Sequence, residues 1–191
     1  MSISPYDRFE QRLRALEDNL DRLSNDVRDL LKERRAGREG PAFSELGFPS
    51  ITRGQAVTFQ ADGDGTPFLG AGWWQQEKWG VWDKGLSELR LHADDYRGGS
   101  LDVSLAIQTL GLSGAPKPAV SIVANGYFIG KYEVGRRDHV LRLRIPPSAV
   151  ATKGDVQLQL THNRPAVPAQ LFGNADERMI GVGLIRLERL C

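Results

Sequence analysis

The sequence predicts an all-β, jelly-roll-like antiparallel sandwich behind an N-terminal α-helical coiled coil. Three observations support this prediction: an unbroken heptad near the start, later stretches that alternate apolar and polar residues, and turn signals between those stretches. The period of the apolar residues sets the boundaries. We expect a parallel coiled-coil oligomerisation helix over residues 1–31, a linker over 32–43 and the sandwich over 44–191.

The heptad runs through residues 6–30, where apolar residues are spaced alternately three and four apart. This spacing predicts a narrow apolar seam that associates with partner helices. Such a helix would be about 37 Å long, and by itself its stability in water would be marginal. We therefore expect the partner helices of the coiled coil to stabilise it. An amphipathic helix packed on its own domain is the alternative. The expected oligomerisation residues are Phe9, Arg12, Leu13, Leu16, Glu17, Leu20, Leu23, Val27 and Leu30.

The number of helices in the coiled coil is indicated by the stretch from Arg12 to Glu17, which places Arg at a g position and Glu at an e position. This stretch resembles the trimer-specifying pattern of short parallel coiled coils, in which Arg pairs with the Glu of a neighbouring helix. Leu at both a and d positions does not demand a dimer. We therefore expect a homotrimer, and a dimer is the alternative.

The linker and the sandwich differ in pattern. Residues 32–41, KERRAGREGP, mix charge with Gly and Pro and predict a hinge. From about Phe43 the period becomes two, which is typical of half-buried strands. Asn125-Gly126 lies between two apolar runs and is the strongest hairpin signal. The predicted strands include 101–107, 120–122, 141–145, 156–160 and 185–188, and the predicted turns include 62–65, 97–99, 125–126 and 153–154.

Composition excludes several classes of protein. Lys and Arg total 25 against 24 Asp and Glu, a formal net charge of +1 that gives no electrostatic footprint for nucleic acid or an anionic membrane. No stretch approaches the roughly 20 apolar residues of a membrane span. The start lacks the pattern of a signal peptide, so we expect cytoplasmic synthesis without Sec-type export. Cys191 is the only cysteine; we interpret it as incidental, with a reactive thiol or an inter-chain contact as alternatives.

All four tryptophans lie within residues 72–82, GWWQQEKWGVW. They either contribute to the core or form a platform for flat, partly apolar ligands such as sugar rings. Neighbouring residues of a strand point to opposite faces, so Trp73 and Trp74 cannot share one environment if the stretch is extended. We place Trp74 on the surface.

The remaining tryptophans allow both readings. On an extended stretch, Trp79 would share a face with Val81 and Trp82 would lie on the other, and we expect at least two of the four tryptophans in the core. The functional hypothesis is narrower: one or two indoles stay exposed, with acceptors for sugar hydroxyls beside them. Polar loop residues lie nearby, and among these Arg164 would suit an acidic polymer. The candidate carbohydrate-binding residues are Trp73, Trp74, Gln75, Glu77, Trp82, Asn163 and Arg164.

The tryptophan stretch, with Glu77 in its middle, resembles the GWxxxExWGxW-type signature of a bacterial β-sandwich domain associated with surface polysaccharides. The resemblance extends over roughly residues 70–190. Trp74 and Gln76 depart from the family's pattern, where we expect a small polar residue and a proline; the first adds an aromatic and the second would loosen the turn. The further segments that resemble the family are 123–126, 129–130, 143–146, 164–165, 168–173, 176–178 and Gly181.

This resemblance implies a sandwich that binds polysaccharide without hydrolysing it. A trimerising rod in front of such a domain resembles the head-spike fibre of gene transfer agents and the receptor-binding spikes of phages. We therefore expect a non-enzymatic subunit that binds bacterial capsular polysaccharide, docks on a larger particle at its N-terminus and is displayed on that phage-like particle. The alternatives are a structural adaptor that binds another protein and an accessory subunit of a polysaccharide-synthesis system.

Catalytic and metal sites have little support. His92, His139 and His162 are scattered, and no pair has a ligand spacing. The stretch 62–65, DGDG, could offer carboxylates to calcium, but it suits a plain turn as well. No phosphate-binding loop or nucleophile elbow is present in the sequence. A glycosidase needs only two facing carboxylates, which the sequence does not exclude. We expect no catalytic residue, metal or cofactor.

Overall fold

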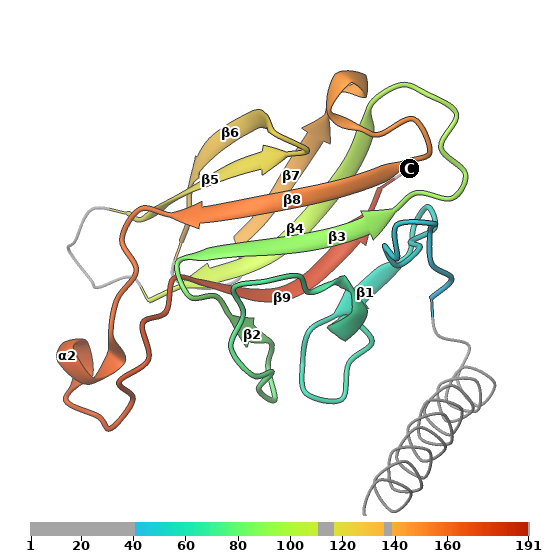
Figure 1. Ribbon diagram of the computed structural model, residues 1–191. Helices are drawn as coiled ribbons and strands as arrows, with labels where there is room; N and C mark the ends of the chain where they lie inside the picture. Colours follow the sequence, from blue (N-terminus) through green and yellow to red (C-terminus); the bar gives the residue numbers. More distant parts are fainter. Residues whose placement is uncertain (1–40, 111–116, 136–138, 191) are drawn as a thin grey trace, which may run out of the picture. The chain divides into compact units, whose positions relative to one another are not determined.

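The computed structural model describes residues 41–110, 117–135 and 139–190 (Figure 1). The chain divides into two units, 1–40 and 41–191, and only the second is described. The predicted coiled coil, with all its oligomerisation residues from Phe9 to Leu30, lies outside the described residues, as do most of the linker and Cys191. The coiled coil, the trimer and the role of Cys191 therefore stay predictions.

The described unit is built from nine strands in two sheets (Figure 1). One sheet has the order β1-β9-β4-β7, with β2 paired to β9, and the other has the order β3-β8-β5-β6. The strands are β1 (Ala56–Thr58), β2 (Val81–Trp82), β3 (Leu86–His92), β4 (Leu101–Thr109), β5 (Ala119–Ala124), β6 (Tyr127–Glu133), β7 (His139–Ile145), β8 (Asp155–His162) and β9 (Val182–Arg189).

Every pair of neighbouring strands is antiparallel. From β3 to β9 the chain passes between the sheets, so that strands distant in sequence become neighbours, such as β4 and β9. This order is that of a jelly roll, which joins two Greek keys. The predicted antiparallel sandwich is confirmed.

The core lies between the two sheets and comes from alternate residues of each strand. In β4, Leu101, Val103, Leu105 and Ile107 are at most 4 % exposed, whereas the residues between them are mostly half-buried. Facing residues of the other sheet, such as Leu158 of β8, are fully buried in the same cluster. The five predicted strands all lie within observed strands, because alternation reports directly which face is dry.

The predicted alternation in the last strand is broken at Ile185. Arg186 pairs with Ala106, but the next pair is Leu184 with Ile107, so Ile185 is an extra residue in β9. Such a β-bulge shifts the side chains beyond it to the other face. Leu184 and Leu187 are therefore both fully buried, and Ile185 is only half-buried.

The predicted hairpin at Asn125-Gly126 joins β5 to β6. Both residues have positive φ, 46° and 85°, as a two-residue primed turn requires. The Asn125 side chain does more than allow this turn. Its Nδ2 donates to the carbonyls of Ala149 and Asp155, and its Oδ1 accepts from the N–H of Gln157. The turn thereby anchors the start of β8.

One short helix, α2 (Pro168–Phe172), interrupts the loop between β8 and β9. Pro168 lies in its first turn, where the missing N–H breaks no helical bond, and Gly173 ends it with φ 66°. The sequence showed no obvious helix here because five residues are too few for a periodic pattern. No helix in the described ranges is long and apolar enough to cross a membrane.

Candidate functional site

The tryptophan stretch folds back on itself before β3. Trp73 forms a bridge with Asp83, and the N–H of Trp74 donates to the carbonyl of Trp82 at 2.9 Å. The two adjacent indoles then bind different segments. Trp73 Nε1 donates to the Glu88 carbonyl of β3 at 2.7 Å, and the ring packs against the core. Trp74 Nε1 donates to the Met179 carbonyl at 2.9 Å. The split between the two rings follows the predicted alternation.

Trp79 lies with Trp82 rather than with Val81, contrary to the prediction for an extended stretch. The two ring centroids are 4.8 Å apart with planes at 64°, an edge-to-face pair. Only Val81 and Trp82 belong to a strand, because Glu77 and Gly80 close a turn through hydrogen bonds between their backbones. Alternation therefore does not extend back to Trp79.

The two rings of this edge-to-face pair lie over Gly183 of β9. A Cβ at this position would come within 2.6 Å of Trp79 and 2.8 Å of Trp82. Trp82 pairs with Gly183 and is 8 % exposed, but it is outside the central core cluster that lies between the sheets. We expected at least two tryptophans in the core. Trp82 is among the buried core residues, and Trp73 is half-buried and packs against the core cluster. Its burial leaves Trp82 little surface for a ligand.

Glu77, Asp176 and Arg178 connect the tryptophan turn to the loop before β9. Arg178 pairs with Asp176 at 2.8 Å and with Glu77 at 2.9 Å. The second oxygen of Glu77 accepts from Trp79 Nε1 at 2.8 Å. The hydrogen bond from Arg178 holds the pKa of Asp176 below its ordinary value, and the bond to Asp176 raises the pKa of Arg178. The Asp176–Arg178 pair is therefore structural, and both Glu77 oxygens already have protein donors.

The ring of Trp74 is half-buried and lies among cations. The Lys84 ammonium is 4.6 Å from its centroid and the Arg178 guanidinium carbon is 5.9 Å away. Lys84 is exposed, and the Met179 side chain beside the indole is 49 % exposed. Trp74 is thus a fixed aromatic ring at the surface with the positive charge of Lys84 over it.

Gln76 strengthens the turn, although we predicted that it would loosen it. Its Nε2 donates to the carbonyls of Phe59 and Gln60, and its Oε1 accepts from the Thr66 hydroxyl at 2.7 Å. The amide thereby replaces the rigidity of a proline with three hydrogen bonds. Gln75 beside it is exposed and has no hydrogen bond within the part of the chain that the structure describes.

Asn163 and Arg164 follow β8 at the same end of the sandwich. The N–H of His162 donates to the carbonyl of Gly85, the residue after Lys84. The Asn163 oxygen accepts from the N–H of Ala119 at 2.8 Å, which gives this side chain a structural role. Arg164 is exposed. The structure therefore brings Arg164 to the end of the sandwich that bears Trp74, and within the described residues the two side chains share no hydrogen bond or cation–π contact.

Asp83 is a site residue that the sequence analysis missed. Its side chain is fully buried and accepts from the N–H groups of Gly85 and Val182 and from the hydroxyl of Ser87. Burial raises its pKa, and the hydrogen bonds oppose that change. A single aspartate thus joins the tryptophan hairpin to β9. Nothing in the local pattern around Asp83 distinguishes it from an ordinary turn residue.

The histidines and the 62–65 turn have structural contacts. His92 Nδ1 lies 2.9 Å from an Asp155 oxygen, and burial lowers the pKa of His162 to about 4. Asp64 accepts from the N–H of Thr58 at 2.8 Å, as in a plain turn. Among the described residues, no group of three or more His, Cys, Asp or Glu side chains is placed to hold a metal ion.

Comparisons with known proteins give no match to a family model and none to a curated sequence. Solved structures give distant matches. A family 35 carbohydrate-binding module from an environmental isolate is 12 % identical, with a TM-score of 0.39 over 78 % of this chain and 91 % of that one. A family 36 carbohydrate-binding module in complex with calcium and xylotriose is 13 % identical, with a TM-score of 0.32 over 55 % and 71 %. A β-glucosidase from Paenibacillus barengoltzii is 14 % identical, with a TM-score of 0.37 over 72 % of this chain, which spans 10 % of the enzyme.

Proposed function

We propose that this protein is a non-enzymatic spike or fibre subunit whose sandwich binds bacterial capsular polysaccharide. The main support is the Trp74 ring, which is partly exposed and fixed by the hydrogen bond from Nε1 to Met179. A fixed indole presents a flat apolar face to the C–H groups of a sugar ring. Gln75 is exposed next to it, and the exposed Lys84, whose ammonium lies over the ring, moves aside for the sugar; both can donate to its hydroxyls.

The rest of the tryptophan stretch supports this platform. Trp82 lies under Trp79, and Glu77 is bonded to both Trp79 and Arg178. The ring that meets the sugar therefore needs little reordering on binding, which reduces the entropic cost. We assign Trp74, Gln75 and Lys84 to ligand contact, and the residues beneath them to positioning.

Weak single sites fit a repeating polymer. A shallow platform leaves most of the ligand surface in water, so the affinity of one site is low. A trimer formed through residues 1–31 and docked on a phage-like particle would present three sites together, which raises avidity by roughly 10² to 10⁴ where the geometry allows.

The experiment is a titration of the full chain with capsular polysaccharide and its oligosaccharide fragments, chosen from a glycan array. Trp74→Ala should weaken binding of the fragments at least about tenfold without changing the melting temperature appreciably. Tyr127→Ala removes another exposed aromatic, from β6, and is the matched control. Unaltered binding in Trp74→Ala, or loss of soluble protein, would contradict the assignment of Trp74.

The role of the coiled coil is tested separately by deletion of residues 1–31. The shortened chain should keep its affinity for a fragment and lose its retention on encapsulated cells by roughly 10² to 10⁴. Light scattering should show a trimer before deletion and a monomer after it. A monomeric full chain would exclude the avidity mechanism, and a dimer would contradict the interpretation of Arg12 and Glu17.

A structural adaptor that binds another protein is the second candidate. Tyr127 and Phe128 are adjacent at the start of β6, and they are 51 % and 67 % exposed. Since neighbouring strand residues point to opposite faces and β6 is at the edge of its sheet, each aromatic is open to a protein that covers its own face of this edge. Sugar binding that depends on Trp74 favours the first candidate, and binding of a protein that depends on Phe128 favours the second.

A further inference from the structure

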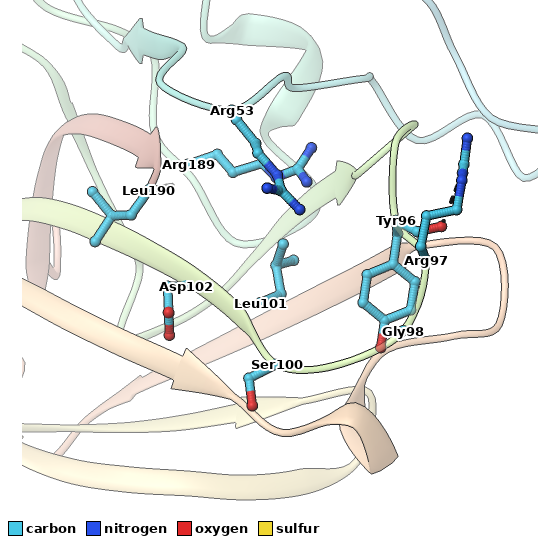
Figure 2. A pocket seen from close by; sticks show the side chains of 9 residues that line it. All are labelled: Arg53, Tyr96, Arg97, Gly98, Ser100, Leu101, Asp102, Arg189 and Leu190. Carbon is cyan, nitrogen blue, oxygen red and sulfur yellow. Dashed lines mark hydrogen bonds between the residues drawn. The ribbon is translucent and has the colours of Figure 1, made fainter.

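A pocket lies where β9 ends, at the opposite end of that strand from Gly183 and the tryptophans. Its walls come from the segment before β1, the loop between β3 and β4, the start of β4 and the end of β9 (Figure 2). None of its lining residues belongs to the tryptophan site. The pocket is therefore independent of the Trp74 platform.

The most unusual side chain of the pocket is Arg189, which is 2 % exposed. Its Nη1 donates to the Ile51 carbonyl at 2.9 Å, and its Nη2 pairs with Asp95. Its Nε has no partner among the described residues. Its Nη1 also lies 3.9 Å from an Asp94 oxygen, so the guanidinium is a buried positive charge in the wall of the pocket that two aspartates partly neutralise.

Two further arginines line the pocket. Arg53 pairs with the other oxygen of Asp95 at 3.2 Å, so Arg53 and Arg189 converge on one carboxylate. Arg97 is exposed and pairs with no carboxylate within the described ranges. Asp102 is the single acid among the lining residues. The lining residues are thus net positive, although Asp94 and Asp95 behind them pair with Arg189 and Arg53 and neutralise much of that charge.

The other walls suit a polyhydroxylated ring. Tyr96 offers an aromatic face, and its hydroxyl donates to the Gly99 carbonyl at 2.7 Å, which fixes the ring. Leu101 adds apolar surface, and Ser100 and Asp102 supply groups that bond to hydroxyls. Mixed apolar and polar walls with a few fixed charges are typical of small-ligand sites.

We infer that this pocket binds a sugar unit with one negative charge, a uronic acid. The carboxylate lies against the exposed Arg97, with the buried Arg189 in the wall behind it, the sugar ring packs on Tyr96, and hydroxyls bond to Ser100 and Asp102. Asp102 disfavours a doubly charged phosphate group more than a singly charged carboxylate, because repulsion between like charges grows with their size. This second site goes beyond the proposed function, since it neither uses Trp74 nor depends on the sugar that Trp74 binds.

The test is an NMR titration of the full chain with galacturonate, galactose and inorganic phosphate. Galacturonate should bind with a Kd on the order of 1 mM and shift the amide signals of residues 96–102. Binding should weaken as salt is raised, because Arg97 is exposed and its charge is screened. Galactose, which lacks the carboxylate, should bind at least about tenfold more weakly.

Arg97→Gln is the decisive variant, since an exposed arginine can be replaced without unfolding the domain. It should weaken galacturonate binding at least about fivefold. Lys131→Gln removes one positive charge from exposed β6 and should leave binding unchanged. Trp74→Ala should also leave it unchanged, which separates this site from the platform.

Four results would overturn the inference. These are the absence of saturable galacturonate binding, equal binding of galactose, tighter binding of inorganic phosphate, and equal loss of binding in the Arg97 and Lys131 variants. If galacturonate binds here while Trp74→Ala leaves capsule binding intact, the second site holds and the Trp74 platform fails.

Discussion

The two ends of β9 are built in opposite ways. At its start, Val182 and Gly183 meet the tryptophan hairpin, where Asp83 accepts hydrogen bonds from two backbone N–H groups and a hydroxyl. At its end, Arg189 is just as deeply buried, but one of its N–H groups has no partner in the described structure and its carboxylate partners are about half exposed. At the first end the buried carboxylate is fully bonded inside the protein, and at the second the buried guanidinium keeps one N–H without a partner in the described structure.

This difference shows where each end can meet a ligand. At the start of β9 the indole nitrogens of Trp73, Trp74 and Trp79 all donate to protein groups, so only ring faces and the exposed side chains around them remain for recognition. At the end of β9 the exposed Arg97 pairs with no carboxylate within the described ranges, and its charge attracts an anion. Recognition by shape is expected at one end and recognition by charge at the other.

Removal of Asp83 should have the largest effect on stability. Asp83→Ala leaves buried N–H groups without an acceptor, and each such group costs about 1 to 3 kcal/mol. The free energy of unfolding should therefore fall by about 3 kcal/mol or more in chemical denaturation. Asp62→Ala, at an exposed position, is the control. A loss below about 1 kcal/mol would show that water replaces the carboxylate and that the N–H groups at the start of β9 do not depend on Asp83.

Removal of Arg189 should cost less, although it is equally buried. In Arg189→Met the apolar chain keeps the packing, and Asp94 and Asp95, 46 % and 45 % exposed, return to water. The main loss is the donor to the Ile51 carbonyl, so we expect about 1 to 2 kcal/mol in the same denaturation experiment. A greater loss than in Asp83→Ala would reverse the comparison of the two ends.

Arg178 tests whether the platform depends on its ionic support. Arg178→Met removes the bonds to Asp176 and Glu77, and since the side chain is 32 % exposed the cost should be only about 1 kcal/mol. The tryptophan fluorescence should shift to the red as the turn loosens, and sugar binding should weaken. Lys78→Met, in the same turn and exposed, is the control. Equal effects of the two variants would exclude a specific role for Arg178.

The smallest expected effect is a pH dependence from His162. Burial lowers its pKa from 6.5 to about 4, so the unfolded chain binds more protons between these values and stability falls as the pH drops through this window. The melting temperature should decrease by a few degrees from pH 7 to pH 5 beyond the decrease in His162→Asn, which retains an acceptor for the Arg164 N–H. Identical pH profiles would show that His162 is solvated.

Local patterns in the sequence were sufficient for much of the fold. Alternation predicted strands such as β4 and β8, because the face of a residue within a strand depends only on its neighbours. Asn125-Gly126 predicted its turn, because positive φ is a property of the residue itself. The same local rule separated Trp73 from Trp74. The resemblance of segments 168–173 and 176–178 to the polysaccharide-associated domain drew attention to the loop before β9. It did not predict which residues that loop contacts.

The tertiary structure decided the rest, because those features depend on partners far away in the sequence. Asp83 and Arg189 are charged residues that the sequence alone would place in water, and they are buried only because Val182 and Ile51 offer partners 99 and 138 positions away. Trp79 lies on Trp82 because a bulge-shifted β9 places Gly183 beneath both rings. The hydrophobic period and the turn residues are local properties and can therefore be predicted from the sequence. A buried charge or an edge-to-face pair of rings forms only once the sheets have assembled.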